Sequence, residues 1–274
     1  IDGLGSNSTL LKIDLSHCDL KDAGVSTLAR SLGSQNTTLQ KLSLGMNSIT
    51  STGVGVLLET MEQNGHHITD LSLQNNSFGN EGASLLARSL ENNALPNLSR
   101  LTLSFCRIGG DGCIALVSAL RENTSLLQLD LRYNGGYGFN ERAYLVLAES
   151  LPEIKVLQQL DFDWCESLAS AMPLLLTGLR KNTSLFHFYV GGCAPRFLPP
   201  TPEETTRCAG GWIQEMERLG YRNRFRTLIG APEEKLPPRG VWPFAFARVA
   251  TLPDVIFEVL RSKPSLVPSE DAGG

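Results

Sequence analysis

The sequence predicts an α/β solenoid, curved like a horseshoe, with a parallel sheet on its concave face, helices on its convex face and a helical C-terminal cap. Three observations predict this fold class. A short apolar pattern recurs at spacings of 28 to 31 residues. Each copy changes from alternating apolar residues to helical spacing. No single copy has enough apolar residues to form its own core, so neighbouring copies must stack.

The first half of each copy follows the pattern L-x-x-L-x-L-x-x-(N/C), and its alternation predicts a short strand. The seven copies begin at Leu10, Leu39, Ile68, Leu98, Leu126, Leu157 and Leu185. Their ninth positions are Cys18, Asn47, Asn76, Cys106, Asn134, Cys165 and Cys193. A buried Asn can bond to the backbone on both sides of the turn that follows the strand. Cys is small and prefers burial, so we expect it to substitute for Asn as a structural residue.

The second half of each copy predicts a helix, because a small residue is followed by apolar residues four and eight positions later. The sets are Gly24-Leu28-Leu32, Gly53-Leu57-Met61, Gly82-Leu86-Leu90, Gly112-Leu116-Leu120, Ala143-Leu147-Leu151 and Ala171-Leu175-Leu179. The small residue lets the helix start close to its neighbour. Strands stack ~4.8 Å apart whereas helices need ~8–10 Å, so the stack must curve with the strands inside.

This two-part repeat resembles the leucine-rich repeat of the ribonuclease-inhibitor type, over roughly residues 1–230. The resemblance implies a leucine-rich repeat domain of about seven repeats with partial repeats at its ends. It also implies a function in protein–protein interaction: an enzyme inhibitor, the sensing domain of a receptor, or a GTPase regulator. Because the motif consists of core positions, it does not choose among these functions.

Beyond the repeats, residues 231–264 are expected to form a C-terminal cap, and residues 265–274 a flexible tail. Prolines interrupt the chain after Ala231, and aromatic residues suited to cover the last repeat follow: Trp242, Phe244, Phe246 and Phe257. A separate binding module is the alternative. At the other end, Ile1 starts in the last turn of a helix. We therefore expect further N-terminal repeats, or a partner chain, to cover the apolar residues Leu4, Leu11 and Ile13.

Composition excludes several function classes. Charged residues make up 19% of the chain and the formal net charge is −4, which argues against nucleic acid as a partner. No run of 18 apolar residues predicts a membrane span. Four of the six cysteines occupy ninth positions, so we expect reduced thiols and an intracellular, cytoplasmic location. Four glycosylation sequons, at Asn7, Asn36, Asn123 and Asn182, are one recurring loop and carry little weight.

The sequence contains no arrangement typical of catalysis. We find no Ser/His/Asp order, no phosphate-binding loop and no Cys/His spacing that suits zinc. Asp130 and Asp161 could bind a divalent cation or act as acid and base. Arg132 lies near both, however, and no nucleophile accompanies them. We therefore expect a protein that is not an enzyme and uses no cofactor or metal.

The candidate binding site lies on the concave face, where residues between the strand leucines point away from the core. The eighth repeat positions are His17, Met46, Asn75, Phe105, Tyr133, Trp164 and Gly192. Phe105, Tyr133 and Trp164 should form a strip of rings there. Asp130, Asp161 and Tyr189 share a neighbouring column, and Arg132 and Asp163 share another. Aromatic residues and Arg are typical of binding hot spots.

The predicted function is therefore a scaffold that binds another protein on this face, with Arg132 as a bidentate anchor and a partner that offers a basic, partly apolar loop. Three alternatives stay open. The face could be solvated, its rings packing only on one another. The chain could be an architectural subunit of a larger assembly. The insertion PRFLPPTPEETT in the seventh repeat, residues 195–206, could instead bind the partner.

Overall fold

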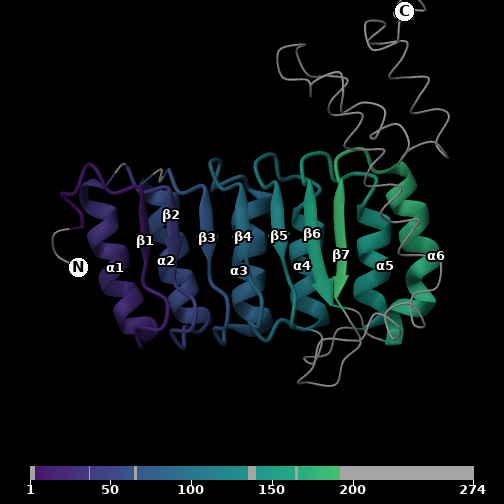
Figure 1. Cartoon of the computed structure of the whole chain (residues 1–274), viewed down its shortest axis with the longest axis horizontal. Coiled ribbons are helices and arrows are strands. Elements are labelled where there is room, and N and C mark those ends of the chain that lie inside the picture. The colour runs from purple at the N-terminus through teal and green to yellow at the C-terminus, as the bar shows by residue number, and fades with distance from the viewer. Residues whose placement is uncertain (1–3, 37, 65–66, 135–139, 164–165, 192–274) are drawn as a thin grey trace, which may run out of the picture.

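The computed structural model of the chain describes residues 4–36, 38–64, 67–134, 140–163 and 166–191. Strands and helices alternate throughout this part (Figure 1). The strands are β1 (Lys12–Asp14), β2 (Lys41–Ser43), β3 (Asp70–Ser72), β4 (Arg100–Thr102), β5 (Gln128–Asp130), β6 (Gln159–Asp163) and β7 (His187–Gly191). The helices are α1 (Lys21–Gln35), α2 (Ser51–Asn64), α3 (Gly79–Glu91), α4 (Gly110–Ala119), α5 (Glu141–Ser150) and α6 (Glu166–Lys181).

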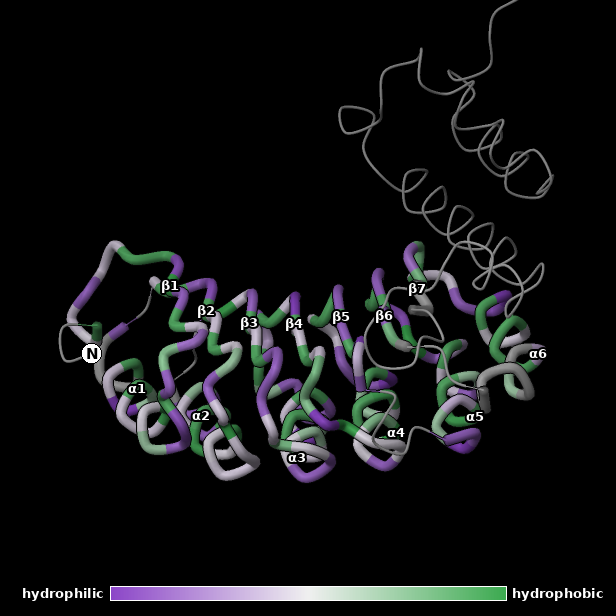
Figure 2. Tube along the Cα trace, turned by 60° about the horizontal axis from the view of Figure 1, so that its bottom comes forward, coloured by the Kyte–Doolittle hydropathy of each residue, from purple (hydrophilic) through white to green (hydrophobic). Residues whose placement is uncertain are grey.

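The strands form one parallel sheet in which each pairs with the next in sequence, β1 to β7. The register places equal repeat positions opposite one another, as in the pairs Ile13↔Leu42 and Leu42↔Leu71. Figure 2 shows an arc with the strands on its inner side and the helices on its outer side. The predicted solenoid, with its concave parallel sheet and convex helices, is therefore confirmed.

The core lies between the sheet and the helices, and the repeating apolar positions fill it. In the fourth repeat, Leu101 and Leu103 of the strand side and Leu116 of α4 are at most 1% exposed. The small residue at the start of each helix is needed for close packing. A Cβ added at Gly53 would lie 2.4 Å from Oδ1 of Asp22, in the preceding helix. That same carboxylate oxygen accepts hydrogen bonds from the backbone N–H groups of Thr50 and Gly53, so the start of α2 packs directly against α1.

The ninth-position residues join each turn to the turn before it. Asn134 accepts from the backbone N–H of Cys106 (2.9 Å) and of Ile108 (3.1 Å), and donates to the carbonyls of Leu103 and Leu131. Cys106 is fully buried and donates its S–H to the carbonyl of Leu73 at 3.1 Å. Burial raises the pKa of the Cys106 thiol to about 12. The structural role predicted for Cys106 and for the Asn residues is confirmed.

A second set of buried Asn residues stabilises the opposite turns, between each helix and the next strand. Asn182 is fully buried and donates to the carbonyls of Leu151 and Ile154. Asn36 and Asn123 are likewise buried and make corresponding bonds to the preceding repeat. A glycan needs an exposed amide, so these three sequons are structural.

Two expectations about the N-terminal repeat are wrong. Leu4 is part of the buried core, and only Leu11 of the predicted apolar face is strongly exposed, at 54%. Cys18 is exposed, although the other ninth positions that the structure describes are buried. No described strand precedes β1, so no earlier turn covers the Cys18 thiol. The predicted cap and tail and the insertion at residues 195–206 lie outside the described residues.

None of the helices that the structure describes combines the length and apolarity needed to cross a bilayer.

Candidate protein-binding surface

The eighth repeat position, one residue before the buried Asn or Cys, has an unusual backbone. His17, Met46, Asn75, Phe105 and Tyr133 all have positive φ angles, between 54° and 61°. Asn adopts this left-handed conformation readily, whereas bulky residues do so at a cost. All five side chains are exposed. The fold therefore imposes the conformation at this position and leaves the side chain in solvent.

Phe105 and Tyr133 use this position to build an aromatic pair. Their ring centroids lie 4.3 Å apart and the rings are nearly parallel, at 8°. The side chains are still 50% and 55% exposed. The predicted strip of rings is thus present for its first two members. Trp164, the third, lies outside the described residues.

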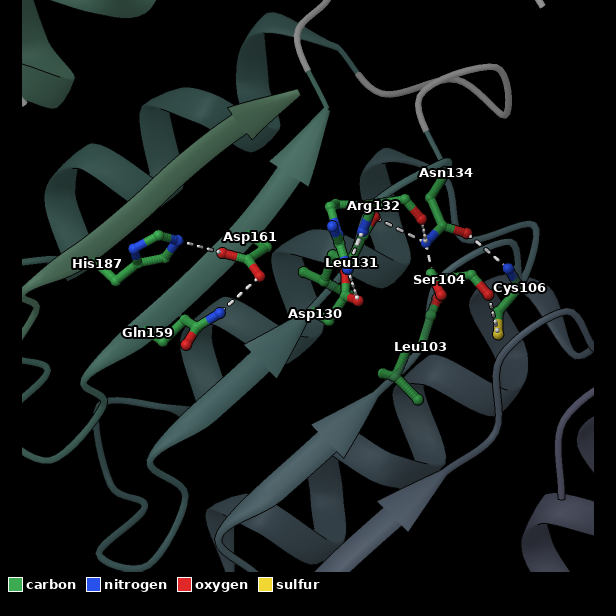
Figure 3. Close-up of polar contacts among 10 residues, drawn as sticks. All are labelled: Leu103, Ser104, Cys106, Asp130, Leu131, Arg132, Asn134, Gln159, Asp161 and His187. Carbon is green, nitrogen blue, oxygen red and sulfur yellow. Dashed lines mark hydrogen bonds and ion pairs between the residues drawn. The ribbon is translucent and has the colours of Figure 1, made fainter. Parts of the chain in front are cut away.

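The carboxylate of Asp130 accepts hydrogen bonds from Arg132, two residues farther along the chain (Figure 3). Arg132 donates to Asp130 through Nε (2.9 Å) and Nη2 (2.8 Å), and its backbone N–H bonds to the same carboxylate at 3.0 Å. These hydrogen bonds from the guanidinium to Asp130 raise the pKa of Arg132 above its usual value. In the structure Asp130 therefore takes the bidentate contact of Arg132 that a partner was expected to take. Whether Arg132 also contacts a partner stays a prediction. The charge of Asp130 is neutralised by the same contact.

Asp161, the register partner of Asp130 on β6, has a different environment. It is only 5% exposed, and its Oδ2 accepts a hydrogen bond from Gln159 at 2.8 Å. Its Oδ1 is buried and has no hydrogen-bond partner among the described residues. The nearest donor atom recorded for it is Nε2 of His187 on β7, at 3.5 Å (Figure 3). Desolvation raises the pKa of the Asp161 carboxyl.

The column that holds Gln159 and His187 is basic over the first four strands. It contains Lys12, Lys41 and Arg100, with Asp70 between the last two. Asp70 pairs with Arg100 at 2.7 Å and with Lys41 at 3.7 Å. This column thus places basic side chains on β1, β2 and β4 of the concave face, with the Asp70 carboxylate paired between two of them.

Two further predicted residues are placed only by their backbones. Asp163 lies in β6 and Tyr189 in β7, where they pair with Gly191 and Asp161 respectively. The column predicted for Tyr189, beside Asp161, is therefore confirmed. The column that Arg132 and Asp163 should share stays a prediction. The analysis of the sequence did not include Gln159 and His187 in the site. The repeat spacing contained the signal, since both residues continue the column of Lys12, Lys41 and Arg100.

The arrangement at this surface combines aromatic and charged groups. It offers two exposed rings, a carboxylate with an unused acceptor, and an internal ion pair. Within the described part of the chain, no group of three or more His, Cys, Asp or Glu side chains could hold a metal ion.

The sequence matches the family model described as "Leucine Rich repeat" in four segments, residues 6–29, 35–58, 66–87 and 94–117. These segments include the first four strands of the sheet and their turns. Strands β5 to β7 continue the same sheet and register. No curated protein matches the chain.

Three solved structures resemble this chain at low similarity. Actin-binding site 2 of leiomodin-1 has 18% identity and a TM-score of 0.46, covering 55% of this chain and 84% of that one. The tropomodulin C-terminal domain of Caenorhabditis elegans has 18% identity and a TM-score of 0.44, covering 55% and 88%. The leucine-rich repeat protein LegL7 of Legionella pneumophila has 16% identity and a TM-score of 0.42, covering 78% and 74%. At these values the likeness bears on neither partner nor activity.

Proposed function

We propose that this leucine-rich repeat protein is a non-catalytic scaffold that binds a protein partner on the concave face of its sheet, around β4 to β6. Repeat solenoids use their extended concave surfaces in this way. The observation that carries the proposal is the pair Phe105–Tyr133, which is stacked, about half exposed and held on left-handed backbone.

The pair contributes little to the stability of the fold. A left-handed conformation costs a bulky residue about 1–2 kcal/mol, and a stacked aromatic pair returns about 0.5–1.5 kcal/mol. The third repeat has Asn75 at the same position and with the same backbone, which avoids most of that cost. Exposed aromatic residues that the fold does not need are typical of interaction hot spots. This balance is what favours a binding role for Phe105 and Tyr133.

The partner should present a basic, partly apolar segment. Since Arg132 neutralises Asp130, Asp161 supplies the remaining negative charge among the described side chains of β5 and β6. We also place the protein inside the cell. Cys106 and Cys113 are buried free thiols, which suit a reducing compartment. Inhibition of an enzyme or regulation of a GTPase would each be a special case of this binding function.

A second candidate function is that of an architectural subunit, held permanently in a larger assembly. Leu11, next to β1, and Leu174, in α6, are strongly exposed near opposite ends of the described solenoid. An assembly that stacks on these ends would bury both residues, and it would leave the concave face free.

The test is affinity capture of a partner from native lysate, followed by binding measurements on variants. Tyr133→Ala and Phe105→Ala should each weaken binding at least thirtyfold, about 2 kcal/mol, as expected for central aromatic anchors. Trp164→Ala should do the same. Lys12→Ala, at the far end of the same face, is the control and should have little effect. If all the aromatic variants bind like the parent while Leu11→Asp or Leu174→Asp does not, the architectural function replaces the proposal.

A further inference from the structure

Two adjacent carboxylates on the concave face differ in how many hydrogen bonds they accept. Asp130 accepts three from Arg132, one from its backbone and two from its guanidinium. Asp161, beside it in the sheet, accepts one from Gln159 on Oδ2. An ionised carboxylate has about four acceptor positions. Asp130 is therefore nearly saturated, and Asp161 keeps an unused oxygen.

The unused oxygen is buried, and this is what points to a ligand. A buried acceptor without a partner loses its hydration without compensation, and more so if it is charged, so native proteins rarely keep one without a reason. His187 does not satisfy it, because 3.5 Å between Nε2 and Oδ1 exceeds the range of an N–H···O bond. The His187 side chain is 51% exposed, so it can turn away and uncover the carboxylate.

The charge around this oxygen selects a cation. Asp130, Arg132 and Asp161 carry −1, +1 and −1, which sum to −1. A second acidic group would be repelled there, whereas an ammonium or guanidinium group would both neutralise the charge and donate the missing hydrogen bond. A metal ion is a poorer match because Arg132 occupies the Asp130 oxygens that would have to join Asp161 as ligands.

We infer that Asp161 selects the partner's charge: a lysine or arginine side chain of the partner displaces His187 and donates to Oδ1 of Asp161, while an apolar side chain nearby contacts Phe105 and Tyr133. This inference rests on the proposed concave-face function and identifies the residue pair that the partner must present.

The sheet geometry also sets the spacing of that pair. Asp161 lies opposite Asp130, one strand across, and Tyr133 follows Asp130 by three residues. Because Arg132 and Tyr133 lie in the turn after β5, these three residues span at most about 10 Å. The basic and apolar side chains of the partner should therefore lie within about 10 Å of each other. That limit corresponds to up to three residues in an extended segment or up to about seven in a helix.

A random peptide library displayed on phage, selected against the whole chain, tests this inference directly. The pool should be enriched in peptides with Lys or Arg within three residues (extended peptides) or within seven residues (helical peptides) of an aromatic or aliphatic residue. The strongest peptide is then synthesised, and its affinity is measured for the parent and for Asp161→Asn, which keeps the side-chain shape. We expect a loss of tenfold or more. Asp14→Asn is the matched control, because Asp14 occupies the same column on β1. It should change the affinity less than twofold.

A double-mutant cycle between the peptide and Asp161 distinguishes recognition of charge from a structural effect of the substitution. Replacing the basic residue of the peptide by norleucine should weaken binding to the parent tenfold or more, and should have no further effect on Asp161→Asn. His187→Ala removes the side chain that must move, so it should bind the peptide as tightly as the parent or more tightly. Arginine and lysine versions of the peptide identify which cation is preferred.

The inference and the proposed function can fail separately. If selected peptides need Phe105 and Tyr133 but bind Asp161→Asn as well as the parent, the charge-selecting role is wrong and the binding face stands. If peptide binding needs Asp161 but not the two rings, the charge-selecting role stands without its apolar neighbour. If no selected peptide needs either feature, both proposals are overturned.

Discussion

The eighth and ninth positions of each repeat are adjacent in sequence but differ in burial and in role. Asn134 is fully buried and bonds to backbone groups of two repeats, whereas Tyr133 is 55% exposed. The fold fixes the residue type at the ninth position because the turn leaves backbone groups that need a partner. At the eighth position it fixes only the backbone, with a positive φ in five described repeats. Variation at the eighth position is therefore available to function.

The largest expected effect concerns thiol reactivity, which distinguishes a covered ninth position from an uncovered one. Cys18 is exposed and should react in the native protein, whereas Cys106 and Cys113 should react only after unfolding. Burial raises the pKa of both buried thiols, which also lowers their reactivity. We expect the labelling rates to differ by on the order of a thousandfold, since a core residue opens only with the whole domain. Native iodoacetamide labelling with peptide mapping measures this, and rapid labelling of Cys106 would contradict a structural role.

The next largest effect should come from removing a ninth-position side chain. Asn134→Ala leaves the backbone groups of Cys106, Ile108 and Leu103 without their partner. We expect a loss of about 3 kcal/mol in the free energy of unfolding, measured by denaturant titration. Asn134→Cys should lose roughly half as much, because a Cys at this position can donate as Cys106 does. Equal losses for the two variants would show that the thiol plays no part in the turn.

A smaller effect should come from the two adjacent carboxylates. Asp161→Asn removes a buried charge with an unused oxygen, so it should raise the free energy of unfolding by about 1 kcal/mol near pH 7. The corresponding rise in Tm is about 2–4 °C. Asp130→Asn is the contrast, and should lower Tm because it breaks the contact with Arg132. A fall in Tm for both variants would show that Oδ1 of Asp161 does have a hydrogen-bond partner in the folded protein.

The pH dependence of that difference follows from the raised pKa of Asp161. The folded state binds a proton at a higher pH than the unfolded state does, so acidification stabilises the parent at this site. The advantage of Asp161→Asn over the parent should therefore be greatest near neutral pH and shrink as pH falls through the raised pKa. Thermal melts of both proteins between pH 7 and pH 4 measure this, and an advantage that grows on acidification would contradict it.

Much of the fold could be predicted from the sequence because the repeat pattern specifies which side chains the strands, helices and turns require. Leu101, Leu116 and Asn134 occupy positions that a strand, a helix and a turn each require. The exposure of Cys18 could not be predicted in this way. Cys18 has the residue type that the ninth position requires, but no described strand or turn covers it, and the motif carries no information about neighbouring repeats.

The candidate site was less predictable because side-chain conformations decide it. The repeat register predicted that Asp130 and Asp161 lie side by side. It did not predict that Arg132 bonds to Asp130, or that His187 on the next strand lies close to Asp161. These contacts depend on rotamers of exposed polar residues, and a repeat pattern does not constrain them.

The central claim is that Phe105 and Tyr133 serve binding and not folding, and one double variant tests it most directly. Phe105→Asn combined with Tyr133→Asn places at both positions the residue that the chain already has at Asn75, on the same backbone. We expect the free energy of unfolding to fall by no more than about 0.5 kcal/mol, because relief of the left-handed strain at two residues offsets the loss of one stacking contact. Affinity for the captured partner should fall by thirtyfold or more. A loss of about 2 kcal/mol or more in stability, with affinity unchanged, would show that the pair is structural and contradict the claim.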